Sequence, residues 1–87
     1  SQLTKYIHTS LHANQLDDDT IRDLEMLVED FESTLPNACD LVFHIETPAS
    51  NVHTLIAKKN KVSSEKEFID ELQDILGEKS VWISGEL

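Results

Sequence analysis

The sequence is poor in cysteine and glycine, and each scarcity excludes a class of protein. Its one cysteine, Cys39, cannot form an intramolecular disulfide, so the chain lacks the cross-links by which small secreted domains compensate for small cores. That favours a reducing, cytoplasmic setting. The two glycines, Gly77 and Gly85, form no Gly-rich phosphate loop. No stretch approaches the roughly 20 apolar residues that cross a bilayer.

Basic residues are also scarce, with seven Lys and Arg against 17 Asp and Glu, a formal net charge of −10. Such a surface repels phosphate backbones and anionic membranes and attracts cationic surfaces. We therefore expect a protein partner with a basic surface, and neither direct nucleic-acid binding nor membrane association. The acidic residues concentrate in one segment that holds a single basic residue, Arg22. They are Asp17, Asp18, Asp19, Asp23, Glu25, Glu29, Asp30 and Glu32.

Catalytic and metal-binding motifs are missing as well, including G-x-S-x-G, H-E-x-x-H and C-x-x-C. Cys39 follows Pro-Asn-Ala at a strand entrance, which is typical of a small buried thiol. His8 and His12 could share a zinc ion on a helix, but on a strand they lie about 13 Å apart. His44 and His53 have no supporting ligand spacing. We predict a non-enzymatic protein without a metal or cofactor.

What the chain does contain is enough for one domain, residues 1–87, with one modest core and two amphipathic helices. The aspartates from Asp17 are typical of a helix start, and Pro36 is expected to end that helix. Its predicted apolar stripe is Ile21, Leu24, Leu27, Val28, Phe31 and Leu35. The second helix is predicted between a capping box of Ser64 and Glu67 and a left-handed C-cap at Gly77. Its stripe is Phe68, Ile69, Leu72, Ile75 and Leu76.

Alternating and β-branched residues predict four strands, at residues 4–12, 41–46, 52–58 and 81–84. The second and third form a hairpin through a turn at residues 47–51. This order predicts an α+β fold, the ferredoxin-like βαββαβ two-layer sandwich with both helices on one face of an antiparallel sheet. If residues 3–12 are instead a helix, the fold is an irregular α+β structure with a three-stranded sheet.

The two faces of this sheet differ in character. The helix-covered face is predicted to carry Leu3, Ile7, Leu11, Leu41, Phe43, Ile45, Val81 and Ile83. The open face is predicted to carry Tyr6, His8, Val42, His44 and Trp82, together with His53 and Leu55. An exposed aromatic and apolar area is a candidate partner or dimer surface. Alternatively, one strand has another register, and Trp82 or Leu55 belongs to the core.

One family resemblance covers residues 6–60. The order of a strand, an acidic-capped helix ending in L-x-x-L-V-x-x-F, and a hairpin is similar to the front of ribosome-hibernation factors. The resemblance implies a ribosome-associated protein that binds ribosomal RNA through basic residues. This chain has acids where such a protein needs lysines or arginines, and it lacks the extra strand before the last helix. No functional residue is carried over.

Together these features predict a small acidic protein that acts by protein–protein interaction. Carboxylates along one helix can imitate a phosphate array and compete for a positively charged groove. The expected role is an inhibitor or immunity-type protein that blocks a basic, nucleic-acid-binding partner. The alternative is a homodimeric structural or assembly module that uses its open sheet face. A plainer explanation of the acidity is that it maintains solubility.

Overall fold

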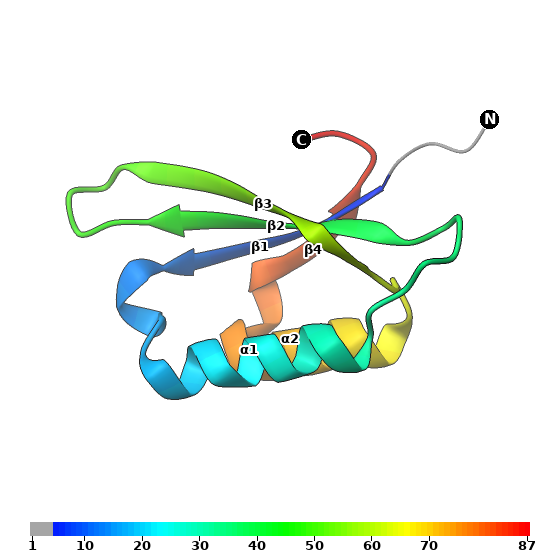
Figure 1. Ribbon diagram of the computed structural model, residues 1–87. Helices are drawn as coiled ribbons and strands as arrows, with labels where there is room; N and C mark the ends of the chain where they lie inside the picture. The colour runs from blue at the N-terminus through cyan, green and yellow to red at the C-terminus, as the bar shows by residue number, and fades with distance from the viewer. Residues whose placement is uncertain (1–4) are drawn as a thin grey trace.

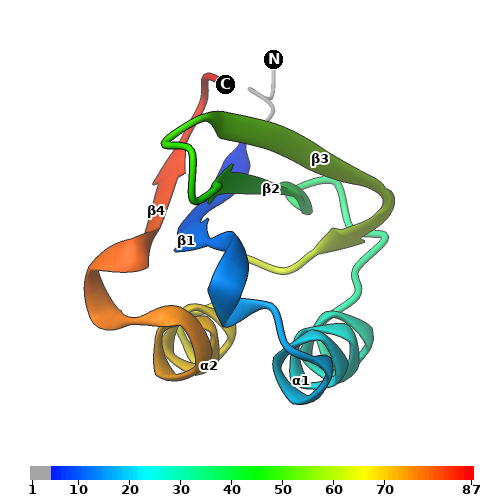
Figure 2. The ribbon, with the colours of Figure 1, turned by 90° about the vertical axis from the view of Figure 1, so that its left-hand side faces the viewer.

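The computed structural model describes residues 5–87, so the predictions for Leu3 and Thr4 lie outside it. Its elements are β1 (Tyr6–His12), α1 (Asp18–Asp30), β2 (Cys39–Glu46), β3 (Val52–Val62), α2 (Lys66–Leu76) and β4 (Val81–Ser84). Figures 1 and 2 show two layers, with both helices side by side against one face of the sheet. The α+β class and the order of elements are confirmed. Because the first segment is a strand, the alternative with an N-terminal helix is wrong.

The sheet is mixed rather than wholly antiparallel as predicted. Its strand order is β3-β2-β1-β4, and β1 lies directly beside β2 in parallel, with Tyr6 opposite Asp40 and Leu11 opposite Ile45. The outer strands β3 and β4 pair antiparallel with β2 and β1. Helix α1 therefore joins two neighbouring strands, whereas a split βαβ unit keeps another strand between them. The order of elements along the chain does not determine which strands become neighbours.

Helix α1 begins as the sequence predicts. The Asp17 carboxylate accepts a hydrogen bond from the Thr20 backbone N–H at 2.8 Å, which lowers the pKa of Asp17 below its usual value. Asp18 and Asp19 occupy the first turn, where the helix dipole favours negative charge. The helix thus starts where an acidic cap satisfies its first free N–H groups.

The end of α1 comes earlier than Pro36. After Phe31 the chain turns to meet the end of β3, where the Ser33 N–H donates to the Lys61 carbonyl at 2.9 Å. That tertiary pairing replaces another turn of helix. Leu35, which the sequence places in the apolar stripe, is therefore 65% exposed, and Ile21 is exposed as well.

Helix α2 begins one residue later than a Ser64 cap would allow. Its N-cap is Glu65, so the predicted capping box with Glu67 does not form; the Glu65 N–H donates to the Ser63 hydroxyl instead, at 3.3 Å. Gly77 ends the helix with a φ of 118° as expected, but its ψ of 145° is extended rather than left-handed helical. Glycine suits this position because other residues rarely adopt such a φ.

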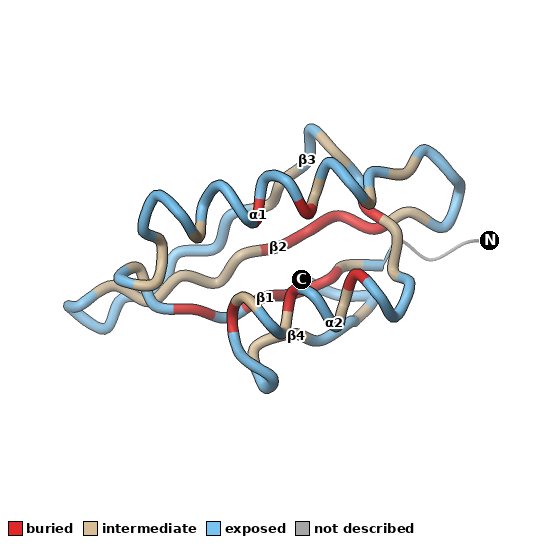
Figure 3. The backbone as a smooth tube through the Cα atoms, turned by 90° about the horizontal axis from the view of Figure 1, so that it is seen from below, coloured by how far each residue is buried: buried red, intermediate tan, exposed pale blue. Residues whose placement is uncertain are grey.

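The core lies between the sheet and the helices (Figure 3). Phe31 and Phe68 bring the end of α1 against the start of α2, with ring centroids 5.3 Å apart. Cys39 is fully buried, as predicted, and burial raises the pKa of its thiol. The buried core residues are Ile7, Leu11, Leu24, Leu27, Cys39, Leu41, Val62, Phe68, Leu72 and Leu76.

The β2–β3 hairpin corrects one prediction about the open face. Leu55 lies opposite Phe43, and His53 lies opposite Ile45. Cross-strand partners share a face, so Leu55 and His53 belong to the helix side of the sheet. Leu55 is nevertheless 56% exposed, because the hairpin extends past the end of the helices (Figure 1). Strand β3 also continues beyond residue 58, as far as Val62.

Two leucines of the predicted stripes should differ sharply in their contribution to stability. Leu72 is fully buried beneath the sheet and Leu35 is exposed. We expect Leu72→Ala to lower the free energy of unfolding by about 2–5 kcal/mol, because it leaves a cavity, and Leu35→Ala by less than about 1 kcal/mol. Urea unfolding of both variants measures this. Equal losses would contradict the position of the α1 C-terminus.

Candidate functional site

The first candidate surface is the solvent side of α1 and α2, here called the acidic helix layer. All eight acidic residues predicted as a binding segment are exposed. The structure adds four from α2, which are Glu67, Asp70, Glu71 and Asp74. The two helices together carry ten carboxylates and two cations, and both cations pair within their own helix. Arg22 meets Asp19 at 3.1 Å, and Lys66 meets Asp70 at 2.6 Å.

The eight predicted acids are not gathered into one site. Asp23 and Asp30 face α2, and with Glu71 they border a shallow concavity between the helices. Its volume is about 250 Å³, and its apolar part is formed by Met26, Leu27 and Ile75. We call this concavity the helix groove.

Four other predicted acids lie outside the helix groove. Glu25 and Glu29 lie on the other side of α1, beside Lys59 of β3. The Asp17 carboxylate is occupied as the N-cap, and Glu32 lies beyond the helix, bridged to the end of β3. The side chain of Met26, which sequence reasoning did not single out, is 56% exposed. In the sequence, the signal that could have drawn attention to it is an apolar residue outside the predicted stripe of its helix.

The second candidate surface is the open face of the sheet. Trp82 lies opposite His8, and His8 lies opposite Val42, so the register places the predicted aromatic and apolar residues on one face as expected. Trp82 is 44% exposed and does not belong to the core. His8 and Val42, however, are buried, at 2% and 0% exposure. This face is therefore only partly open.

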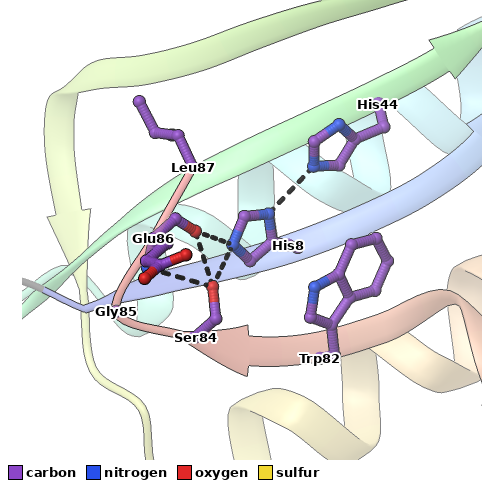
Figure 4. Close-up of a pocket in the computed structure, with 7 residues that line it drawn as sticks. All are labelled: His8, His44, Trp82, Ser84, Gly85, Glu86 and Leu87. Atoms are coloured by element: carbon purple, nitrogen blue, oxygen red, sulfur yellow. Dashed lines mark hydrogen bonds between the residues drawn. The ribbon is translucent and has the colours of Figure 1, made fainter.

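Three rings on this face, those of His8, His44 and Trp82, lie nearly parallel and form what we call the ring cluster (Figure 4). His8 Nδ1 and His44 Nε2 are 2.9 Å apart, so the two imidazoles meet edge to edge, with centroids separated by 5.1 Å. The Trp82 indole is within 13° of both, at 5.0 Å from His8 and 5.4 Å from His44. The indole therefore packs against both imidazoles.

The carbonyl of Glu86 sets the direction of the hydrogen bonds through these rings. A carbonyl oxygen only accepts, so His8 Nε2, 3.0 Å away, must carry a proton. In the neutral ring Nδ1 is then an acceptor, and His44 Nε2 donates to it. His44 Nδ1 accepts in turn from the Thr54 hydroxyl at 3.2 Å. Each imidazole then carries its proton on Nε2, in one directed chain from Thr54 to Glu86.

Residues 84–87 complete this surface, and sequence reasoning missed them. The Ser84 hydroxyl donates to the Glu86 carbonyl at 2.6 Å and accepts from His8 Nε2 at 2.8 Å. Ser84 is two residues after Trp82, so the period of a strand could have placed it on the same face. The concavity of about 570 Å³ shown in Figure 4 is lined by His8, His44, Trp82, Ser84, Gly85, Glu86 and Leu87.

The structure also bears on the metal, thiol and membrane predictions. His8 and His12 lie on a strand, where about 13 Å separates residues four apart, so they do not form the zinc pair that a helix would allow. Among residues 5–87, no three or more His, Cys, Asp or Glu side chains are placed to hold a metal ion. Cys39 is enclosed in the core. No helix in the described part of the chain is long and apolar enough to span a membrane.

Comparison with known proteins finds no matching family model, no matching curated protein and no matching solved structure. The resemblance to ribosome-hibernation factors therefore stays a prediction from the order of elements alone. The geometry of the two surfaces is the basis on which a function can be proposed.

The lowered pKa of His44 should make stability depend on pH. Burial lowers the pKa of His44 below its ordinary 6.5, and the neighbouring His8 lowers it further. Below pH 6.5 the unfolded chain then binds more protons at this residue than the folded chain does. We expect the free energy of unfolding to fall as the pH drops through this value, as measured by urea unfolding between pH 7.5 and roughly pH 5.

The matched variants separate His44 from the other histidines. His44→Gln retains an amide N–H that can donate to His8 and should flatten the pH dependence. His53→Gln changes an exposed histidine on the other face of the sheet and should leave the dependence as it is. An unchanged slope in His44→Gln would count against the proposed tautomer chain.

Proposed function

We propose that this protein is a non-enzymatic binding module that engages a basic protein partner through the acidic helix layer. The supporting observation is the helix groove, where carboxylates from both helices flank an exposed apolar side chain. A binding protein of this kind would act as an inhibitor or immunity-type protein that occupies the cationic surface a partner uses for nucleic acid. We place this activity in the cytoplasm, where a reducing environment keeps Cys39 as a thiol.

The charge distribution supports a steering role. Ten helical carboxylates with only two local cations produce a negative field over one side of the molecule. Such a field raises the rate at which a cationic partner arrives and repels nucleic acid and other anions. Because this attraction is electrostatic, salt screens it. At 1 M salt the Debye length is only about 3 Å, so the long-range attraction is weak.

The helix groove adds a short-range contact to this field. Asp23 and Asp30 lie on α1 and Glu71 on α2, with Met26 exposed among them. A partner residue with an apolar stem and a cationic end fits such a border, as does a leucine flanked by lysines. Desolvation of Met26 would contribute affinity that salt does not screen. The proposed partner surface is therefore basic with an apolar anchor.

A homodimer through the open sheet face has less support. His8 and Val42 are already buried, and the backbone of Glu86 is hydrogen-bonded to His8 across this face. In such a dimer, residues 84–87 would lie between the second copy and the strands of this face. The exposed Trp82 is the feature that keeps this alternative as a prediction.

The binding proposal predicts a difference between two pairs of carboxylates. The probe is a short, end-blocked peptide with lysines and leucines at helical spacing, and its lysine-to-glutamine version is the control. Asp23→Asn/Glu71→Gln should weaken binding about five- to tenfold at low salt, since each exposed ion pair contributes roughly 0.2–1 kcal/mol. Glu46→Gln/Glu78→Gln removes the same charge outside the groove and should weaken it less than twofold. Fluorescence anisotropy measures both.

Two results would count against the proposal. Equal losses in the two double variants would mean that only net charge attracts the peptide. Binding of the glutamine version with the same affinity would mean that the surface does not select cations. A further comparison, Met26→Ser, should reduce the affinity that remains at high salt, where the apolar anchor dominates.

A further inference from the structure

The ring cluster is a second, independent surface, on the opposite side of the sheet from the acidic helix layer. It borders the concavity of about 570 Å³ shown in Figure 4, in which Trp82 offers an exposed indole. Trp82 is the only tryptophan of the chain. The chemistry of the lining determines what this concavity can accept.

The hydrogen-bond donors of the lining are largely used within the protein. His44 Nε2–H donates to His8, and His8 Nε2–H donates toward Ser84 and Glu86. The Ser84 hydroxyl donates to the Glu86 carbonyl. The indole N–H of Trp82 stands outside this chain, and one neutral donor does not offset the charge of an anion.

The charge of the lining points the same way. The seven lining residues include no lysine or arginine and one carboxylate, that of Glu86. The lining therefore offers an acidic side chain and no lysine or arginine to balance it, within a chain of net charge −10. Phosphates and carboxylates are therefore disfavoured. What remains for a ligand is the face of an electron-rich ring beside a carboxylate.

We infer that the ring cluster binds a guanidinium group, stacked on Trp82 and paired with the Glu86 carboxylate. Trp is the side chain that attracts cations most strongly over its ring face. A guanidinium is planar and weakly hydrated, so it stacks on an aromatic ring at lower desolvation cost than a lysine ammonium does. The nearly parallel orientation of the three rings suits a flat ligand. The group comes either from a small guanidinium compound or from an arginine side chain of a protein.

Trp82 itself reports binding, because its fluorescence is the only indole emission of the chain. The probes are methylguanidinium, an end-blocked arginine, its lysine counterpart and benzoate. We expect saturable quenching by the two guanidinium compounds, with the arginine probe binding about fivefold or more tightly than the lysine probe. Benzoate should not bind. Tighter binding of the arginine probe than of methylguanidinium identifies a protein-borne arginine as the source, and the reverse order identifies a small compound.

Matched variants separate the local carboxylate from the overall field. Glu86→Gln should weaken arginine-probe binding about two- to fivefold, because it removes one ion pair. Glu78→Gln removes the same charge from an exposed position after the end of α2 and should change the affinity by less than 1.5-fold, since screening acts within about 8 Å at physiological salt. Neither change alters a core residue or a side chain of the imidazole chain.

Trp82→Leu should abolish binding of the arginine probe. Because this variant lacks the indole reporter, its binding is measured by the NMR shifts of the His44 ring protons, and circular dichroism checks its fold. If that variant does not fold, the comparison of Glu86→Gln with Glu78→Gln still decides. Equal affinity for arginine and lysine probes, binding of benzoate, or equal losses in the two charge variants would overturn the inference. Failure of the helix groove to bind basic peptides would not count against the guanidinium inference, since the two surfaces share no residue.

Discussion

Direct parallel pairing of β1 with β2 is the constraint on which the rest of the structure depends. Antiparallel neighbours can be joined by a tight turn, but parallel neighbours need a crossover, and here α1 supplies it. The crossover places α1 on one face, and α2 joins it there because its Phe68 packs against Phe31. The same pairing sets His8 beside Val42 on the other face. Both candidate surfaces follow from this one arrangement.

The two layers separate charge from aromatic character. In so small a domain most residues of the two helices face solvent. In this chain, many of those exposed residues are Asp or Glu. Repulsion among them raises the energy of the folded state, which the buried leucines and Phe68 must offset. The ring cluster avoids this repulsion because Glu86 is the one acidic side chain that lines its concavity. A protein built this way can meet a cationic partner on one side and a flat ligand on the other without one competing with the other.

The imidazole network shows how a single backbone group can define the protonation of a surface. The Glu86 carbonyl accepts from His8, and that requirement passes to His44 and on to Thr54. Burial disfavours an additional proton on His44, and so does the neighbouring His8 imidazole. Both effects lower the pKa of His44. The proposed preference of this face for cations arises from the ring of Trp82 and the Glu86 carboxylate.

Local chemistry accounts for what could be predicted from the sequence. Asp17 caps a helix because its carboxylate bonds a nearby N–H, Gly77 ends one because it accepts a positive φ, and alternation along a strand assigns Trp82 to one face. These effects act within a few residues, so the sequence alone determined the order of the elements and where α1 begins. It also determined that the chain is strongly acidic around α1.

Tertiary structure decided the features that depend on residues far apart in the chain. The end of α1 moved to Asp30 because residues beyond it meet β3, and the mixed sheet formed because strand neighbours are selected by packing across the core. Leu55 changed faces because the register of the hairpin, rather than its own alternation, assigned it. The bond from His8 to Glu86 spans 78 residues, a pairing that no local pattern encodes. Proximity of this kind is a property of the folded chain.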